Sequence, residues 1–359
     1  MKSALLILTR VITLKTIMRR GLRLSTRSLS SALRSTPPPA ALTTILTRAP
    51  SASDLLRVHE RHHEAFNAIH VSAFWVRLGR LARGCSQERA WLRANPRAVE
   101  HSRECTIDML PRLDSRELAN TAHGVASTGV GSALPWSEFW SGVASSALPQ
   151  LDRFSAAELK NTVWAFATAR TRAPALFDDV AAETMSRLEQ LRPEEVAMLA
   201  WAYARSGHEA PALLASLGAV AERQLPQYGP RELASTAWAL AHADAAAPGF
   251  FDALAAHLPS RAAELGPTEL ASAAWGLGRA GRATAELLDA LAPAARAALP
   301  RFGTRNLATL ATPYSLSAAS LGEPSRELLL VPSARSARGT DSCGAGGLMT
   351  AGTSPTGGG

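Results

Sequence analysis

The chain has 359 residues, long enough for two ordinary domains or one elongated array, and 47% of them are apolar. Aromatic residues contribute only 6%, and Ala supplies much of the apolar content, which is typical of packed helices rather than sheets. Residues 1–53 carry nine of the 38 basic groups and no acid, so the rest of the chain has 29 basic and 30 acidic groups. A globally basic RNA-binding protein is therefore excluded, and any nucleic-acid site has to be a local patch.

The first 53 residues form a basic leader. They are rich in Arg, Ser and Thr, and Arg10 and Lys15 interrupt the longest apolar run. That run is too short for a membrane span and too charged for a secretory signal core. An acid-free stretch of this kind is typical of an organelle transit peptide, which predicts the mitochondrial matrix, with a plastid as the alternative. A disordered basic tail that binds nothing is the other interpretation.

Residues 54–112 are expected to form a helical N-terminal region. The segment FNAIHVSAFWVRLGRLAR, residues 66–83, has helical periodicity and is interpreted as a degenerate first repeat. His62 and His63 lie in HERHHEAF. A solvated helix face is the better explanation for them than a metal site, because no second ligand cluster stands at usable spacing.

The three cysteines are Cys85, Cys105 and Cys343. Their odd number and the absence of a CxxC pair argue against a disulfide framework and against structural zinc. We expect reduced, buried or inert thiols, no bound metal and no cofactor.

Four columns of residues recur with a period of 37. The columns are Trp164, Trp201, Trp238 and Trp275; Glu158, Glu195, Glu232 and Glu269; Phe154, Leu191, Tyr228, Leu265 and Phe302; and Phe139, Leu176, Leu213, Phe250 and Leu287. A single unit of this length cannot bury its apolar face, whereas a stack of units can. The period therefore predicts an all-α fold, an α-solenoid of 37-residue two-helix repeats.

The second helix of each unit begins at a recognisable signal. Ser155 with Glu158, and Asp114 with Glu117, have the three-residue offset of a capping box. Three later units instead place a proline in the first helical turn, where it is tolerated. These prolines are Pro193, Pro230 and Pro267.

The repeat array covers residues 113–312 and decays at both ends. Upstream, His123 replaces the Trp, and four extra residues are expected in the loop around 129–135. Downstream, Pro313 stops the pattern. Residues 313–359 are expected to be a disordered tail rich in Gly, Ser and Thr.

The phrases ELANTAHGVASTG, ELKNTVWAFATAR and ELASTAWALAHAD resemble the repeats of octotricopeptide and heptatricopeptide organellar RNA-binding proteins. These families are related to the helical region of FAST-kinase-like proteins, and the resemblance covers roughly residues 67–312. It implies binding of single-stranded organellar RNA, with other ribonucleoprotein components as further partners, in transcript processing, stability or translation. Such proteins often end in a small nuclease-like RAP domain, and nothing after residue 312 resembles one.

Two other functional classes were weighed. A protein-binding α-solenoid scaffold in an organelle is the alternative, because the body of the chain is nearly neutral. An enzyme is disfavoured, since the sequence contains no GxxxxGK[ST], HExxH, GxSxG or kinase signature.

A candidate RNA-binding face follows from helical geometry. Positions three and ten residues after the repeated Glu are about two turns apart and project from one side of the second helix. The polar residues there are Asn120, Asn161, Ser235 and Ser272 at the first position, and Ser127, Thr168, Arg205, His242 and Arg279 at the second. A small residue between them, seven after the Glu, would let an RNA strand approach closely.

Each of these columns has a structural alternative. The polar stripe could be an inter-helix contact, and Met198 interrupts it. The Trp column could offer a stacking platform, but packing between neighbouring units is the favoured interpretation. The repeated Glu is interpreted as a helix-start group rather than a general acid.

Overall fold

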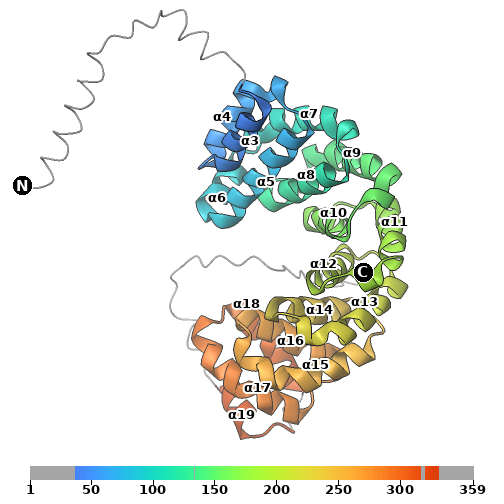
Figure 1. Cartoon of the computed structure of the whole chain (residues 1–359). Coiled ribbons are helices and arrows are strands. Elements are labelled where there is room, and N and C mark those ends of the chain that lie inside the picture. Colours follow the sequence, from blue (N-terminus) through green and yellow to red (C-terminus); the bar gives the residue numbers. More distant parts are fainter. Residues whose placement is uncertain (1–36, 133, 317–319, 331–359) are drawn as a thin grey trace, which may run out of the picture. The chain divides into compact units, whose positions relative to one another are not determined.

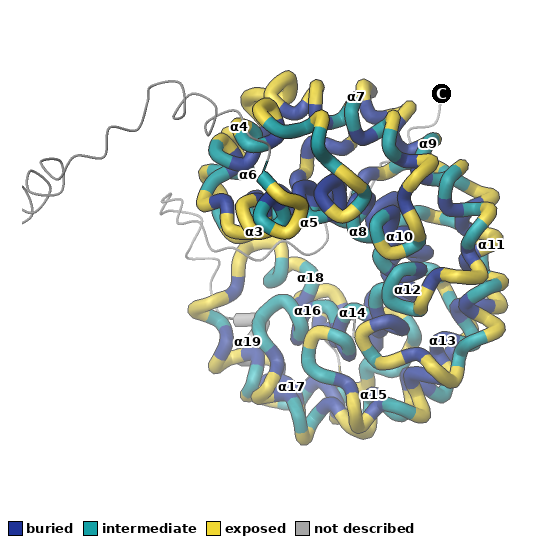
Figure 2. Tube along the Cα trace, turned by 45° about the horizontal axis from the view of Figure 1, so that its top comes forward, coloured by how far each residue is buried: buried dark blue, intermediate teal, exposed yellow. Residues whose placement is uncertain are grey.

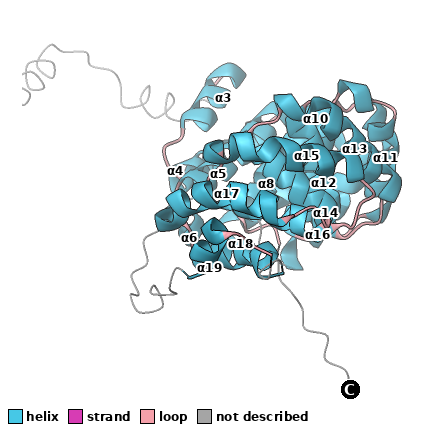
Figure 3. Cartoon of the chain, turned by 90° about the horizontal axis from the view of Figure 1, so that it is seen from below, coloured by secondary structure: helices cyan, strands magenta, loops and turns pink. Residues whose placement is uncertain are grey.

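The computed structural model of the chain describes residues 37–132, 134–316 and 320–330. The chain divides into two compact units, Met1–Leu42 and Thr43–Gly359. Every regular element of the described residues is a helix, in agreement with the all-α prediction (Figures 1 and 3). None of these helices is long and apolar enough to cross a membrane. Most of the predicted transit peptide, and residues 331–359 of the predicted tail, lie outside the described residues.

The helices of the second unit form two rows, and helices that are neighbours in a row contact each other, except that α11 contacts the 3₁₀ turn Leu148–Arg153 after α9 (Figure 1). The tryptophan row contains α5 (Ala68–Gly84), α8 (Ser115–Thr128), α10 (Ala156–Ala169), α12 (Pro193–Ser206), α14 (Pro230–His242), α16 (Pro267–Arg279) and α18 (Thr304–Leu316). The opposite row contains α7 (Glu100–Met109), α9 (Ser137–Ala147), α11 (Pro174–Met185), α13 (Pro211–Gln224), α15 (Pro248–Arg261), α17 (Ala285–Ala298) and α19 (Glu323–Leu330). Helices α4 (Ala52–His62) and α6 (Ser86–Ala94) contact α5, and α3 (Pro39–Arg48) crosses the boundary between the two units.

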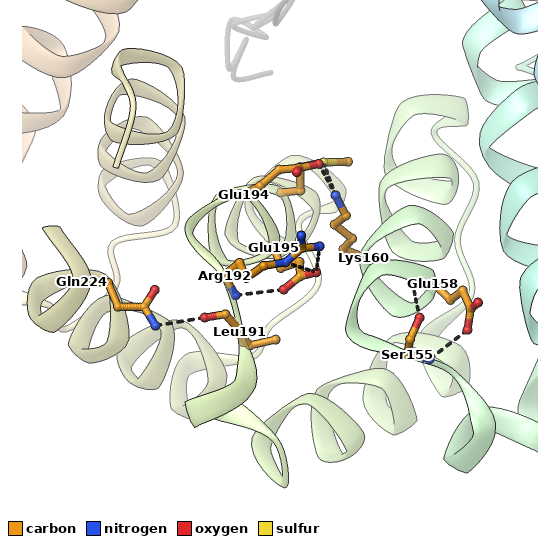
Figure 4. A network of polar contacts seen from close by, with 9 residues as sticks. Ser155, Glu158, Lys160, Leu191, Arg192, Glu194, Glu195 and Gln224 are labelled. Carbon is orange, nitrogen blue, oxygen red and sulfur yellow. Dashed lines mark hydrogen bonds and ion pairs between the residues drawn. The ribbon is translucent and has the colours of Figure 1, made fainter. Parts of the chain in front are cut away.

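The starts of the tryptophan-row helices follow the predicted signals. The Ser155 hydroxyl accepts from the Glu158 N–H, and the Ser155 N–H donates to Glu158 Oε2 at 2.8 Å, which completes a capping box (Figure 4). The prolines that open α12, α14 and α16 occupy the first turn, as predicted. At α8 only half of the predicted box forms, because Asp114 caps the N–H groups but Glu117 does not bond back. Burial, and then a hydrogen bond with Asp114, raise the pKa of Glu117 to about 7.

Small residues let the helices of the tryptophan row approach each other closely. A Cβ on Gly124 would lie 2.5 Å from the backbone carbonyl carbon of Trp75, and one on Gly276 would lie 2.7 Å from the Ala237 oxygen. Ala165 and Ala202 occupy the same repeat position and are fully buried. Figure 2 shows buried stretches of chain in the helices of this row. The apolar core therefore continues from one helix of this row to the next.

One set of hydrogen bonds links each pair of helices to the preceding pair. These bonds were not predicted from the sequence. Gln150 donates to the Leu113 carbonyl at 3.3 Å, Arg187 to the Phe154 carbonyl, Gln224 to the Leu191 carbonyl at 2.9 Å, and Arg261 to the Tyr228 carbonyl at 2.8 Å. The four donors recur every 37 residues, and Figure 4 shows the Gln224 bond. Each bond satisfies a loop carbonyl that has no helical partner.

The loop prediction at the upstream end agrees with the structure. Helix α8 ends at Thr128 and α9 begins at Ser137, whereas α10 ends at Ala169 and α11 begins at Pro174. The additional residues therefore lie between α8 and α9.

The predicted leader extends too far. Over residues 43–53 the chain is helical except at a short turn, and Leu46 and Ala52 are fully buried. Arg77 of α5 donates to the Ala49 carbonyl at 2.8 and 2.6 Å. Folded chain therefore begins before residue 53. The prediction failed because residues 43–53 resemble a transit peptide in composition and yet pack into the helical fold.

The predicted disordered tail also begins too early. Helix α18 continues through Pro313 to Leu316, and Tyr314 is fully buried and donates to the Leu288 carbonyl at 2.9 Å. Helix α19 packs on α17, and the Gly322 N–H donates to Asp289 at 2.9 Å. Pro313 packs against Gly278 of α16, where a Cβ on the glycine would lie 2.9 Å from the proline Cβ.

Candidate nucleic-acid interface

Eight of the nine candidate residues remain at least partly accessible. Asn120, Asn161, Thr168, Arg205, Ser235 and Ser272 are half-buried, whereas His242 and Arg279 are exposed. Ser127 is the exception, because it is buried, its Cβ lies where α5 passes Gly79, and its hydroxyl has no described hydrogen-bond partner. The assignment of Ser127 to a ligand-binding face is therefore wrong.

The residue in the middle of the stripe also differs from the prediction. The small residues seven positions after the Glu are buried against the preceding helix, as at Gly124 and Ala165. The Trp six positions after the Glu lies three residues after the first polar position and four before the second. It therefore lies on the same side of the helix as both. We call the accessible candidate residues, together with His123 and the four tryptophans, the tryptophan face.

The tryptophans form two groups along this face. The rings of His123, Trp164 and Trp201 follow one another at centroid distances of 4.6 and 6.3 Å. Further on, Trp238 stacks on His242 at 4.5 Å and lies 6.4 Å from Trp275. Each ring therefore contacts a ring of a neighbouring helix, as the packing interpretation requires.

The tryptophans are not equally covered. Trp201 and Trp238 are 9% and 7% exposed, while Trp164 and Trp275 are half-buried. Trp201 Nε1 is buried and has no hydrogen-bond partner among the described residues. The column thus combines packing between helices with aromatic surface at both of its ends.

Basic side chains surround the first aromatic group. Burial, followed by the positive charges of Arg83, Lys160 and Arg80 in that order, lowers the pKa of His123 to about 4. Arg80 and Arg83 come from α5, and Lys160 comes from α10. The sequence prediction missed all three, although Arg80 and Arg83 are one helical turn apart in the degenerate repeat.

A second basic group surrounds the other end of the face. Burial lowers the pKa of His242, and the charges of Arg205 and Arg279 contribute to the shift. Arg205 lies close enough to Arg170 for that charge to lower its pKa after the effect of burial. The structure therefore brings together Arg205, His242 and Arg279, three of the predicted residues, from three successive helices.

These cations differ in whether they have partners. Lys160 is buried and pairs with Glu194 (Figure 4). By contrast, Arg80, Arg83, Arg205 and Arg279 form no ion pair with any other described residue. Side chains that repel one another and have no counter-charge favour an anionic ligand.

The repeated Glu serves the helix starts, as predicted. Glu158 and Glu195 each accept from a backbone N–H three residues earlier, both at 2.8 Å. Glu195 is buried and also pairs with Arg192. Carboxylates held in this way stabilise the positive end of the helix dipole rather than point into a cavity.

The fold brings further ligand residues close to His63. A second ligand cluster does lie beside His63, because His101 and Cys105 place ligand atoms within 4.8 Å of it and of each other. His101 and Cys105 lie four residues apart on α7, a spacing that can place two ligands on one side of a helix and that was overlooked in the sequence. His63 lies far from them in sequence and gave no such signal.

The tryptophan face can hold a strand that is negatively charged and carries flat groups. Arginines bind phosphate, aromatic edges and faces bind bases, and the Asn and Ser side chains offer hydrogen bonds. A scan of protein-family models finds no match for this chain, and a search of curated proteins finds no similar sequence.

Proposed function

We propose that the protein is an RNA-binding α-solenoid of 37-residue two-helix repeats, and that single-stranded RNA lies along the tryptophan face. The two rows of helices and the 37-residue recurrence of the inter-unit hydrogen bonds support the repeat architecture. The repeat phrases resemble octotricopeptide and heptatricopeptide proteins, which supports a role with organellar transcripts. The basic leader supports a mitochondrial location, with a plastid as the alternative.

The observation that carries this proposal is the pairing of unpartnered cations with aromatic rings on one face. Arg205 and Arg279 flank Trp238 and His242, and neither arginine pairs with a described acid. Stacking tolerates every base, and phosphate contacts supply sequence-independent affinity. The proposed activity is binding.

The test compares two double variants with the same change in charge. Arg205→Glu with Arg279→Glu removes the cations of the face, whereas Arg153→Glu with Arg301→Glu alters exposed residues of the 3₁₀ turns after α9 and α17. Each full-length protein is titrated with a pool of single-stranded organellar RNA over a salt series, and the retained RNA is sequenced. The basic leader is identical in all proteins, so the difference between variants reports the face.

We expect the first variant to lose at least about tenfold in affinity and its salt slope to fall by about 1.4, or 0.7 for each lost phosphate contact. The second variant should bind like the parent. Equal losses in the two variants would mean that only net charge matters. Absence of retention by the folded parent at low salt would reject RNA binding and favour the protein-binding scaffold.

A further inference from the structure

A cluster of nitrogen and sulfur ligands lies in the N-terminal helices, outside the tryptophan face. His63 opens the short 3₁₀ turn His63–Ala65 that follows α4, while His101 and Cys105 lie one turn apart on α7. The ligand atoms of all three lie within 4.8 Å of one another. The cluster therefore joins two segments about 40 residues apart in the sequence.

The separations suit a tetrahedral metal centre. Cys105 Sγ lies 3.7 Å from His101 Nε2. A zinc ion with Zn–S near 2.3 Å and Zn–N near 2.0 Å holds a sulfur and a nitrogen about 3.5 Å apart at the tetrahedral angle. Nδ1 of the His101 ring lies 3.8 Å from the sulfur, so this ring has to turn to direct one nitrogen at an ion shared with Cys105.

One nitrogen of the His63 ring is held by the backbone. Its Nδ1 lies 3.3 Å from the backbone carbonyl oxygen of Glu60, and the ring donates its proton there. Nε2 then keeps its lone pair and is free for a metal. Bound histidines commonly hold their second nitrogen in this way, through a backbone carbonyl or a carboxylate.

The surroundings offer access and negative charge. A cavity of about 250 Å³ lies beside the cluster, and its lining includes His63, Cys105, Glu64 and Asp108. His63 and Cys105 are half-buried and His101 is exposed, so an ion can enter from solvent. The two carboxylates supply charge that favours a cation.

We propose that His63, His101 and Cys105 bind one zinc ion, with a water molecule from the cavity as fourth ligand. The Cys105 thiol releases its proton to solvent when the metal binds, and the thiolate and two neutral imidazoles then fill three positions. The ion cross-links the end of α4 to α7 and stabilises the N-terminal helices. This site is independent of the proposed RNA binding.

The direct test is cobalt binding by the full chain, purified without a polyhistidine tag. Co²⁺ substitutes for zinc in such sites, and its bond to a thiolate gives a near-ultraviolet charge-transfer band. We expect this band in the parent and in Cys85→Ser, and its loss in Cys105→Ser. Excess Zn²⁺ should displace the cobalt and remove the band.

Two histidine variants separate coordination from general damage. His63→Ala should weaken Co²⁺ binding at least about tenfold, while His62→Ala, at the neighbouring position, should leave it unchanged. Circular dichroism checks that each variant is folded. A parent that shows no thiolate band, or a band that survives in Cys105→Ser, overturns the proposal.

Discussion

The two rows of helices use arginine differently. In the opposite row, Arg187 and Arg261 donate to carbonyls of the preceding unit and also pair with an acid of their own segment. In the tryptophan row, Arg205 and Arg279 have no such partner among the described residues and lie beside aromatic rings. Arg187 and Arg261 thus link neighbouring pairs of helices, whereas Arg205 and Arg279 leave positive charge beside the aromatic rings.

This difference explains why net charge is a poor guide to the function of this chain. The nearly neutral body contains charges that pair locally, such as Arg187 with Glu183, and cations without an ion pair among the described residues, such as Arg205 and Arg279. A ligand responds to the local potential rather than to the sum. The near-neutral composition is therefore compatible with an anion-binding face.

The largest expected effect concerns the aromatic column, where packing and the proposed binding overlap. Trp238→Ala should lower the free energy of unfolding by about 3–5 kcal/mol, because Trp238 is 7% exposed and packs against His242 and Trp275. Trp164→Ala should cost less, since this ring is half-buried. Thermal or denaturant unfolding measures both.

A Trp238→Ala protein that keeps its melting temperature but loses RNA would contradict the packing role. Trp238 would then be a residue that stacks on RNA bases. The tryptophan row would differ from the opposite row only in ligand binding.

Much of the fold could be predicted because the same residue pattern recurs along the sequence. The apolar columns, the first-turn prolines and the Ser155 cap all have local physical causes that are visible at one position and repeated at the next. The predicted ends failed for the opposite reason. Composition resembled a leader before residue 53 and a tail after residue 313, whereas burial of Leu46 and Tyr314 depends on neighbours far along the chain.

The candidate face was only partly predictable. Spacing along one helix identified Arg205, His242 and Arg279. Which side of a helix is covered depends on how the helix is rotated in its row, and this rotation places Ser127 on a buried side. The inter-unit donors were hidden because Gln224 and Arg261 differ in charge while sharing one role, donation to a carbonyl. Metal-ligand spacing gave no signal that would link His63 to Cys105, and both lie outside the regular repeats.

Removing one arginine from each row should affect different properties of the protein. Arg261→Ala should lower the free energy of unfolding by about 1–2 kcal/mol, because the Tyr228 carbonyl loses a charged donor. RNA affinity should not change. Arg205→Ala should do the reverse, with a several-fold loss of affinity and little change in stability. Denaturant unfolding and RNA titration of both variants provide the comparison.

If Arg261→Ala weakened RNA binding as much as Arg205→Ala, the two rows would not be distinct in function. If Arg205→Ala destabilised the protein by the larger amount, Arg205 would have a structural partner of its own.

The smallest expected effect concerns His123, which faces Arg80 and Arg83 of α5 and Lys160 of α10. Burial and these charges lower its pKa in the folded protein to about 4, whereas the unfolded imidazole takes up a proton near pH 6.5. The unfolded state therefore binds more protons between these values, so stability is complete above pH 6.5 and falls as the pH drops towards 4. We expect a contribution of about 1 kcal/mol after solvent screening, which His123→Gln should remove from the pH profile of unfolding.

A bound phosphate would favour the protonated ring, so RNA should bind the parent more tightly as the pH falls from 7 to about 5.5. An RNA affinity with the same pH dependence in His123→Gln would place the phosphate away from this end of the tryptophan face.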